Sequence, residues 1–374
     1  MPVQIIFGQG RVEHVGRVIR RYGHTVFIVT GRNSARETGL LSRVAGLLEA
    51  EGLESIVFDQ VEPNPSGSTV EAGVRLLQEH RCDVVLGLGG GSAMDAAKAI
   101  AFAAVNPGDI CEYMDGRSGH GALPLVMITT TAGTGSEADS MAVLTHDATR
   151  DKKAIKSRFI YPRASIIDPE LMTTLPPTTI AATGFDALCH CVEAFIARGS
   201  TPITDVLALR AIEFLTRSLP LVYQDPHNLE AWEEVALAST IGGMVIDQAG
   251  VTLPHGLEHP LSGIYDVPHG EGLAAVLLPA IEFTRAAVVE KWSVLAGAMG
   301  DDTNENDAVD RVLTSIKKLL CQIELTPSLQ EMGVTEADLG PLADKVQETM
   351  YYAINNHPRV PNRDEIIAIY RQSL

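Results

Sequence analysis

The sequence is short of positive charge. It has 29 Lys and Arg residues against 47 Asp and Glu residues, which gives a net charge of −18 over 374 residues. An acidic surface repels the phosphates of nucleic acids and of anionic lipids, so we expect neither a nucleic acid nor a membrane as partner. Solvated acidic faces are enough to explain this charge, which therefore says little about chemistry.

The sequence also lacks the hydrophobic segments that direct a chain to or across a membrane. We find no uninterrupted apolar run of the roughly 18–20 residues that span a bilayer. Residues 1–23 have neither the long apolar stretch nor the small-residue cleavage site of a signal peptide. A cytoplasmic protein is therefore expected.

Cysteine is scarce, and its five positions do not suggest disulfides. The cysteines are Cys82, Cys111, Cys189, Cys191 and Cys321. An odd number in a long chain without a secretion signal argues against a disulfide framework. Cys189 and Cys191 flank His190, but neighbouring side chains on a helix diverge by about 100°, so the three cannot converge on one ion. We interpret both cysteines as packing residues.

The arrangement of apolar segments predicts two domains, which the length also favours. In the first part of the chain, strand-like segments 25–30, 54–58, 83–88 and 125–129 alternate with helical stretches 36–51 and 68–80. This alternation predicts an α/β domain, residues 1–168, with a parallel sheet covered on both faces. Beyond it strand-like runs become scarce, which predicts an all-α domain over residues 169–374. Its helical segments are 178–198, 203–219, 229–248 and 280–299.

A glycine-rich segment follows the third predicted strand. Gly89, Gly90, Gly91 and Ser92 lead into a predicted helix over 93–105, with Ser92 as its N-cap. Glycines let the backbone approach a ligand, and the start of a helix attracts a phosphate. The segment is not a GxGxxG fingerprint, so a tight strand–helix turn without a ligand is the alternative.

A second unusual segment, residues 129–137, follows the next predicted strand. It holds five hydroxyl side chains and two glycines in nine residues. Such groups can bind phosphate, ribose or amide oxygens, although a polar surface loop would look similar. The carboxyl ends of neighbouring parallel strands open on one edge of a sheet, where nucleotides bind. The two segments together therefore favour a nucleotide site.

Two pairs of polar residues four positions apart indicate a metal site in the helical part. Asp186 and His190 share one helix face, as do His255 and His259, and His269 follows shortly after. Their surroundings are apolar, and titratable groups in such places need a partner or an ion. Carboxylate and imidazole ligands suit Fe2+ or Zn2+, and the residues alone do not choose between them. Local hydrogen bonding along a helix face is the alternative for each pair.

The segment from His255 to His259 also fits the H-x-x-E-H pattern of zinc proteases, with Glu258 to activate water. The pattern is short enough to occur by chance, and it leaves both nucleotide-type loops unexplained. Pro260 directly after His259 is expected to end the helix that would carry both histidines.

Four motifs in order make the chain similar to the iron-containing (group III) alcohol dehydrogenases. They are GGGSAMDAAK (89–98), TTAGTGSE (130–137), TGFDALCHCVEA (183–194) and HGLEHPLSGIYDVPHG (255–270). The resemblance extends over nearly the whole chain. It implies an N-terminal α/β nucleotide domain and a C-terminal helical domain, of the fold shared with dehydroquinate synthase.

The resemblance also implies roles for individual residues. Asp186, His190, His255 and His269 match the positions of the metal ligands, and His259 matches a position on a proton path near nicotinamide and substrate. A further set matches positions that contact the dinucleotide: Asn64, Gly89, Gly90, Gly91, Ser92, Asp95, Thr130, Thr131, Thr134, Ser136 and Lys152.

One departure from the family pattern bears on the cofactor. Relatives that prefer NAD often have an acidic residue after the first strand, where this chain has Gly31, followed by Arg32, Asn33 and Ser34. Without a carboxylate there is no repulsion against a 2′-phosphate, and Arg32 could pair with it. This predicts NADP(H) over NAD(H). The alternative is that Gly31 only serves the turn and that either cofactor binds.

The predicted activity is hydride transfer between a small alcohol, diol or aldehyde and NADP(H) or NAD(H), with one divalent metal polarising the substrate oxygen. Fe2+ is the expected ion, or Zn2+, and the enzyme is expected to be a homo-oligomer. A metal-independent reductase of the same fold and a non-catalytic nucleotide-binding protein are the alternatives. The intact set of four predicted ligands argues against both.

Overall fold

The chain divides into two compact units. The computed structural model describes residues 2–149, 151–300 and 307–374. One unit is Met1–Thr174 and the other Leu175–Leu374, whereas the sequence placed the boundary between residues 168 and 169. The short 3-10 turn η4 (Pro169–Met172) that follows the last strand of the sheet thus stays with the first unit.

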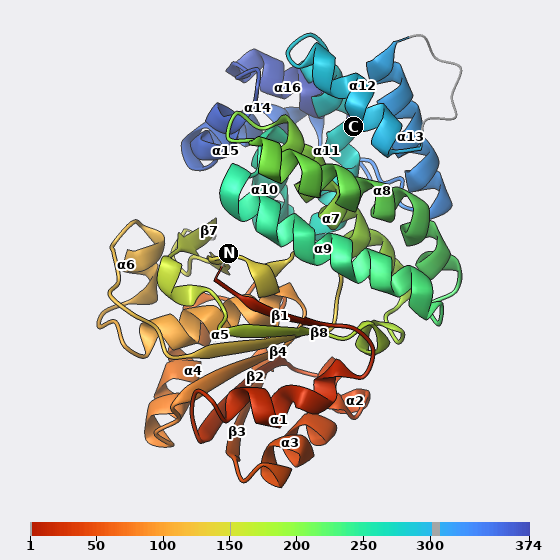
Figure 1. The fold of residues 1–374 in the computed structure, drawn as a ribbon. Coiled ribbons are helices and arrows are strands. Elements are labelled where there is room, and N and C mark those ends of the chain that lie inside the picture. Colours follow the sequence, from red (N-terminus) through yellow and green to blue (C-terminus); the bar gives the residue numbers. More distant parts are fainter. Residues whose placement is uncertain (1, 150, 301–306) are drawn as a thin grey trace. The chain divides into compact units, whose positions relative to one another are not determined.

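The first unit is built around a parallel sheet of six strands in the order β1-β8-β5-β4-β2-β3 (Figure 1). β3 lies on one side of β2 and β4 on the other, so the strand order reverses between β2 and β4. A crevice outside the carboxyl ends of such strands is where α/β sheets bind ligands. The strands are β1 (Gln4–Phe7), β2 (Thr25–Gly31), β3 (Glu54–Val61), β4 (Val84–Gly89), β5 (Leu125–Thr129) and β8 (Ala164–Ile167).

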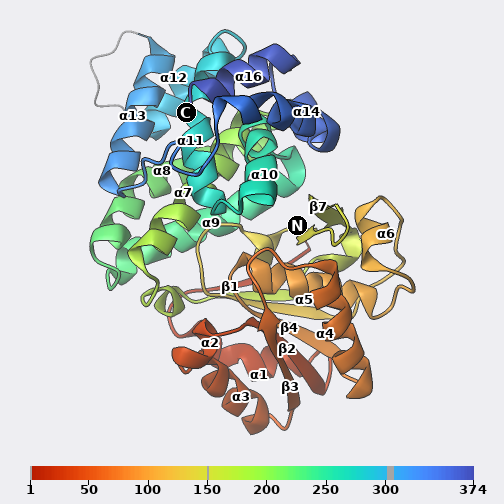
Figure 2. The ribbon, with the colours of Figure 1, turned by 180° about the vertical axis from the view of Figure 1, so that it is seen from behind.

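Helices cover both faces of this sheet, as Figure 2 shows from behind. Successive strand residues point to opposite faces. Phe27 and Val29 of β2 therefore pack in one apolar cluster with α4 and α5, and Val26 and Ile28 pack in another with α1 and α3. The helices are α1 (Val15–Ile19), α2 (Ser34–Glu37), α3 (Leu40–Ala50), α4 (Gly67–Glu79), α5 (Gly91–Ala103) and α6 (Ile110–Met114).

The predicted α/β class with a parallel sheet is confirmed, with three local differences. The stretch 36–51 is two helices, because Gly39 adopts a left-handed conformation (φ 74°) between α2 and α3. The helix after β4 begins at Gly91 with Gly90 as N-cap, so Ser92 is not the cap. The sequence did not reveal the short strands β1 and β8, or the hairpin of β6 (Met141–Thr145) and β7 (Lys152–Lys156).

In its described part the second unit consists of helices, packed around α7. This helix contacts α8, α9, α10 and α11. The helices are α7 (Pro177–Ile196), α8 (Pro202–Gln224), α9 (Leu229–Ala249), α10 (Leu253–Tyr265), α11 (His269–Thr284), α12 (Val289–Ala298), α13 (Ala308–Gln322), α14 (Leu339–Thr349), α15 (Tyr351–Asn356) and α16 (Arg363–Arg371).

The all-α prediction for this unit is confirmed, and two of its details are wrong. Residues 280–299 are not one helix, since α11 ends at Thr284 and α12 begins at Val289. Pro260 does not end its helix, because α10 continues through it to Tyr265. Proline removes one backbone donor from a helix but does not have to break it where packing holds the flanking turns.

α7 is long and apolar enough, by length and composition alone, to cross a membrane. However, 83% of its most apolar window is buried within the structure. It also has Asp186, His190 and Glu193 on one face. These are the features of a core helix.

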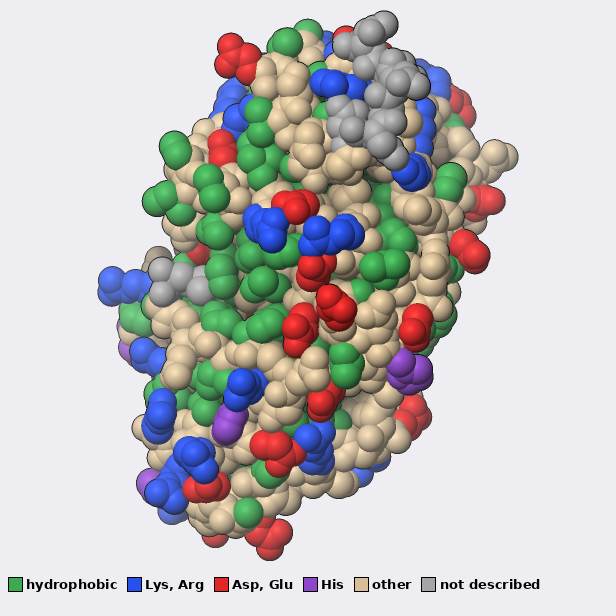
Figure 3. Space-filling view, turned by 45° about the vertical axis from the view of Figure 1, so that its right-hand side comes forward, with side chains coloured by type: hydrophobic (Ala, Val, Ile, Leu, Met, Phe, Trp, Pro, Cys, Tyr) green, Lys and Arg blue, Asp and Glu red, His purple; other side chains and the backbone are tan. Residues whose placement is uncertain are grey.

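Charged side chains of both signs lie next to one another on the face shown in Figure 3. Ion pairs such as Arg217–Glu234 and Arg210–Glu213 link exposed side chains on the helical unit. The acidic excess is thus mixed with basic groups on this face, as expected for solvated surface.

Candidate metal centre and dinucleotide loops

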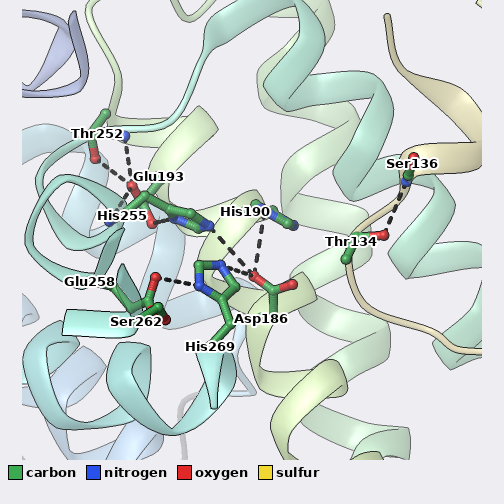
Figure 4. Close-up of polar contacts among 10 residues, drawn as sticks. All are labelled: Thr134, Ser136, Asp186, His190, Glu193, Thr252, His255, Glu258, Ser262 and His269. Carbon is green, nitrogen blue, oxygen red and sulfur yellow. Dashed lines mark hydrogen bonds and ion pairs between the residues drawn. The ribbon is translucent and has the colours of Figure 1, made fainter. Parts of the chain in front are cut away.

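Four polar side chains from three helices meet inside the second unit. The Nε2 atoms of His190, His255 and His269 lie 3.4, 3.5 and 3.6 Å from the same oxygen, Oδ1 of Asp186. Figure 4 shows the three contacts converging on that carboxylate. The structure therefore brings together all four residues that the sequence predicted as metal ligands.

The spacing of these atoms fits ligands of one ion better than hydrogen-bond partners. Asp186 Oδ1 and His255 Nε2 are buried and have no hydrogen-bond partner in the described structure. Ligands that lie about 2.1 Å from a tetrahedral ion are roughly 3.4 Å apart. Asp186, His255 and His269 each offer a ligand atom that lies within 4.8 Å of those of the other two. The donor set, one carboxylate and three imidazoles, suits Fe2+ or Zn2+.

Local sequence explains how each ligand reaches this point. Asp186 and His190 are one turn apart on α7, so they share a face. His255 lies in the first turn of α10. Asp266 ends α10 with a left-handed backbone (φ 54°), and the chain turns so that His269 begins α11. Of the four side chains, that of His269 is the most exposed, at 29%.

Glycines let the three helices approach closely. A β-carbon on Gly270 would lie 2.1 Å from the carbonyl oxygen of Ala182 on α7. One on Gly272 would lie 2.8 Å from Cγ of Glu258 on α10. Any side chain at these positions would push α11 away from its neighbours, so the glycines on either side of Glu271 set the position of His269.

The buried charges of the site depend on one another. Burial favours the neutral acid of Asp186, but the charges of His190 and His269 and the contact with His255 hold its pKa well below the usual range. Burial lowers the pKa of His190 to about 4. Burial also acts against His255, yet Glu193 and Asp186 raise its pKa to about 10. The ionised carboxylates buried here are stabilised only by nearby positive charge, which a divalent cation would supply.

Two glutamates that the sequence did not assign to the metal site contact its histidines. Glu193 of α7 accepts a hydrogen bond from His255 Nδ1 at 2.5 Å, and Glu258 of α10 pairs with His269 Nδ1. Both are fully buried. Glu193 follows Asp186 by seven residues and so shares its helix face, a spacing that could have revealed it.

These contacts also bear on the zinc-protease pattern. Glu258 is fully buried and accepts a hydrogen bond from Ser262 in addition to its contact with His269. It is therefore a partner of a histidine and not a group open to a water molecule. His259 lies beside the four ligands, with its ring centroid 6.1 Å from that of His255 and 5.6 Å from that of His269.

In the first unit, the two loops that the sequence singled out lie against each other. β4 and β5 are adjacent, and Thr130 N donates to the carbonyl of Gly89 at 3.0 Å. A β-carbon on Gly91 would lie 2.5 Å from the Thr134 side chain, and one on Gly90 would lie 3.0 Å from that of Thr131. Gly90, Gly91, Ser92, Thr130, Thr131 and Thr134 are all partly exposed. The loops thus form an accessible pair at the carboxyl edge of the sheet.

Asp95 and Ser136 are engaged inside the unit. The Asp95 carboxylate accepts hydrogen bonds from Ser136 Oγ at 2.6 Å and from Val143 N at 3.0 Å. Lys98, which the sequence did not single out as a site residue, is fully buried and donates to Ser136 Oγ and to Asp139. This network fastens the second loop to α5, and direct contact of Asp95 and Ser136 with a dinucleotide stays a prediction.

Of the other predicted cofactor positions, Gly31 and Asn64 fall at or after the carboxyl ends of β2 and β3, whereas Lys152 begins β7. Asn64 follows β3, and its carbonyl accepts from Thr145 Oγ1, while Thr145 pairs in the hairpin with Lys152. Asn64 and Lys152 are therefore close. Gly31 ends β2, and Arg32 to Ser34 are exposed behind it.

The comparisons with known proteins identify the class of protein to which this fold belongs, an oxidoreductase family. The family described as iron-containing alcohol dehydrogenase matches residues 2–169, and its C-terminal family matches residues 180–374. The chain belongs to the iron-containing alcohol dehydrogenase family.

Relatives and solved structures agree over the full length. The 1,3-propanediol dehydrogenase of Klebsiella pneumoniae is 35% identical, over 100% of this chain and 97% of that relative. The NAD-dependent methanol dehydrogenase of Bacillus methanolicus is 32% identical, over 100% and 99%. A crystal structure of 1,3-propanediol oxidoreductase superposes with a TM-score of 0.94 at 33% identity, covering 100% of this chain and 98% of that one.

Proposed function

We propose that this chain is a metal-dependent dehydrogenase for small alcohols or diols, or a reductase of the corresponding aldehydes, that uses a nicotinamide dinucleotide. The observation that carries the proposal is the approach of three imidazole Nε2 atoms to Asp186 Oδ1 at 3.4–3.6 Å. Relatives named as alcohol, propanediol and methanol dehydrogenases support the same reaction class.

Asp186, His190, His255 and His269 would hold one Fe2+ or Zn2+. A divalent ion in this place supplies a Lewis acid for the oxygen of the alcohol or aldehyde. His259 is partly exposed beside the ligands and is the candidate to move the alcohol proton towards solvent, since imidazole titrates in the useful range.

The loops after β4 and β5 would bind the dinucleotide. The amino end of α5 offers free backbone N–H groups to a pyrophosphate, and Gly89 to Gly91 let it come close. The choice of NADP(H) over NAD(H) rests on Gly31 and Arg32 alone. The relatives do not support that preference, because the methanol dehydrogenase is named as NAD-dependent.

The proposal is tested on protein purified without oxygen, by measuring metal content and alcohol oxidation with NAD+ and with NADP+. About one iron or zinc per chain, with activity that a chelator removes, is the expected result. The His269→Ala variant should lose metal and turnover while it still binds the dinucleotide.

The matched control for this variant is His24→Ala, which removes an exposed histidine of the first unit. It should keep both metal and activity. Activity that survives complete metal removal would instead indicate the metal-independent reductase. Full turnover in His269→Ala would contradict the assignment of the ligands.

A further inference from the structure

Two of the three helices of the site contact a histidine on the next helix through a buried glutamate. α7 contributes Glu193, which accepts from His255 Nδ1 on α10. α10 contributes Glu258, which pairs with His269 Nδ1 on α11. No glutamate contact of this kind is present for His190 in the described structure, where the ion pair of His190 joins its Nε2 to Asp186.

We propose that Glu193 and Glu258 are positioning residues that fix the ring orientation and tautomer of His255 and His269 for metal binding. The inference rests on the proposed metal site. An ionised carboxylate can only accept, so beside Glu193 and Glu258 the proton of each neutral imidazole belongs on Nδ1. Nε2 then presents its lone pair, and in both residues Nε2 is the atom that faces Asp186.

Further contacts hold the Glu193 carboxylate rigidly in place. Its Oε2 accepts from Thr252 N at 2.6 Å and from Thr252 Oγ1 at 3.1 Å, while its Oε1 accepts from His255. Thr252 is the N-cap residue of α10, so the carboxylate lies at the start of that helix, where unpaired N–H groups and the helix dipole favour a negative charge. The same carboxylate therefore positions the helix and the ring that the helix carries.

The Glu258 carboxylate is held by contacts with α10 and α11. Its Oε1 accepts from Ser262 Oγ, one turn further along α10, and Gly272 leaves room for its side chain against α11. Because α11 begins at His269, this contact determines how the first residue of α11 faces the site.

The test measures metal affinity directly and not activity. Metal-free wild type, Glu193→Gln and Glu258→Gln are titrated with Zn2+ and with Co2+ against a competing chelator. Loss of a carboxylate behind a ligating histidine typically weakens metal binding by about 10- to 100-fold, and we expect that loss in both variants. Dinucleotide affinity should stay unchanged, because the predicted dinucleotide loops belong to the first unit.

Two controls separate positioning from general packing. Thr252→Val removes one hydroxyl that donates a hydrogen bond to Glu193, and Ser262→Ala removes one that donates to Glu258. Each variant leaves the glutamate in contact with its histidine. Both should bind metal with less than about a tenfold loss. Glutamine variants that bind both metals as tightly as wild type, while His255→Ala loses them, would overturn this inference alone. A wild type that binds neither ion would overturn the proposed metal function as well.

A measurement on the wild type covers the case in which a glutamine variant does not fold. In the zinc-loaded protein with 15N-labelled histidine, NMR couplings show which ring nitrogen carries the proton. Protons on Nδ1 of His255 and His269 are expected. A proton on Nε2 of either residue would overturn the inference.

Discussion

Gly270 lies against the backbone of Ala182, with room for a hydrogen but not for a methyl group. A β-carbon there would be 2.1 Å from the Ala182 carbonyl oxygen, and backbone atoms cannot move aside as a flexible side chain can. We therefore predict that Gly270→Ala displaces the start of α11 and with it His269. The metal content of the purified variant should fall well below that of wild type, and its melting temperature should drop.

Gly297 provides the control. It lies within α12, and a β-carbon there would meet nothing within 4 Å. Gly297→Ala should keep the metal and be stabilised by about 0.5–1 kcal/mol, since alanine favours a helix over glycine. Equal metal content in both variants would show that the close approach at Gly270 is not needed.

The contact between Gly91 and Thr134 makes a similar prediction for the dinucleotide. A β-carbon on Gly91 would lie 2.5 Å from Thr134 Cγ2, so Gly91→Ala should separate the two loops and weaken NAD+ or NADP+ binding by about tenfold or more. Fluorescence titration measures this affinity. Gly46→Ala in α3, where nothing lies within 4 Å, should bind as wild type does.

Lys98 is fully buried, and its Nζ lies 2.6 Å from Asp139 Oδ1. Lys98→Met would leave Asp139 and Asp95 near each other without their cation. Breaking a buried pair in this way costs about 3–5 kcal/mol, and urea unfolding followed by circular dichroism should show the loss.

The surface pair Lys153–Asp115 has the same N–O distance of 2.6 Å but is partly exposed to water. Lys153→Met should therefore lower the free energy of unfolding by less than about 1 kcal/mol. If Lys98→Met and Lys153→Met lower the free energy of unfolding by the same amount, the buried pair contributes no more to stability than the exposed one.

Metal removal should destabilise the protein as well as inactivate it. An ion that binds only the folded state adds about 4 kcal/mol when its free concentration is 1,000 times its dissociation constant. We therefore expect a chelator to lower the melting temperature of wild type and to leave that of His269→Ala unchanged. An identical fall in both proteins would mean that the chelator acts elsewhere.

Gly31→Asp tests the predicted preference for NADP. The position has space, since the nearest atom to a β-carbon would be the Val61 carbonyl oxygen at 3.9 Å. A carboxylate there would repel a 2′-phosphate, so kcat/KM with NADP+ should fall about tenfold or more relative to NAD+. An unchanged ratio would place the 2′-position of the ribose away from Gly31.

The sequence predicted much of the fold because its signals are local. A strand such as β5 (Leu125–Thr129) is a short β-branched run between polar segments, and its bounds matched the prediction. The edge strand β1 and its neighbour β8 have four residues each, too few for a pattern to stand out. The break at Gly39 escaped because a glycine inside a helical pattern is usually tolerated.

In the candidate site too, the sequence predicted what depends on local spacing and missed contacts between helices. Spacing alone put Asp186 with His190 on one face of a helix, and the motifs supplied His255 and His269. The sequence did not show that Glu193 and Glu258 would contact those histidines, because each of these contacts joins two different helices. Nor did the sequence show that Lys98 would be buried beside Asp139, because the charged end of a lysine on a helix usually reaches solvent.

The sequence by itself determined the class of fold, the residue types for a metal and a dinucleotide, and the order of the motifs. These depend on periodicity and composition, which act over a few residues. Only the tertiary structure decided that Asp186 Oδ1 would face three Nε2 atoms at 3.4–3.6 Å. That convergence depends on how closely α7, α10 and α11 pack, which glycines such as Gly270 permit. It also depends on the orientation of the histidine rings, which buried glutamates such as Glu193 fix.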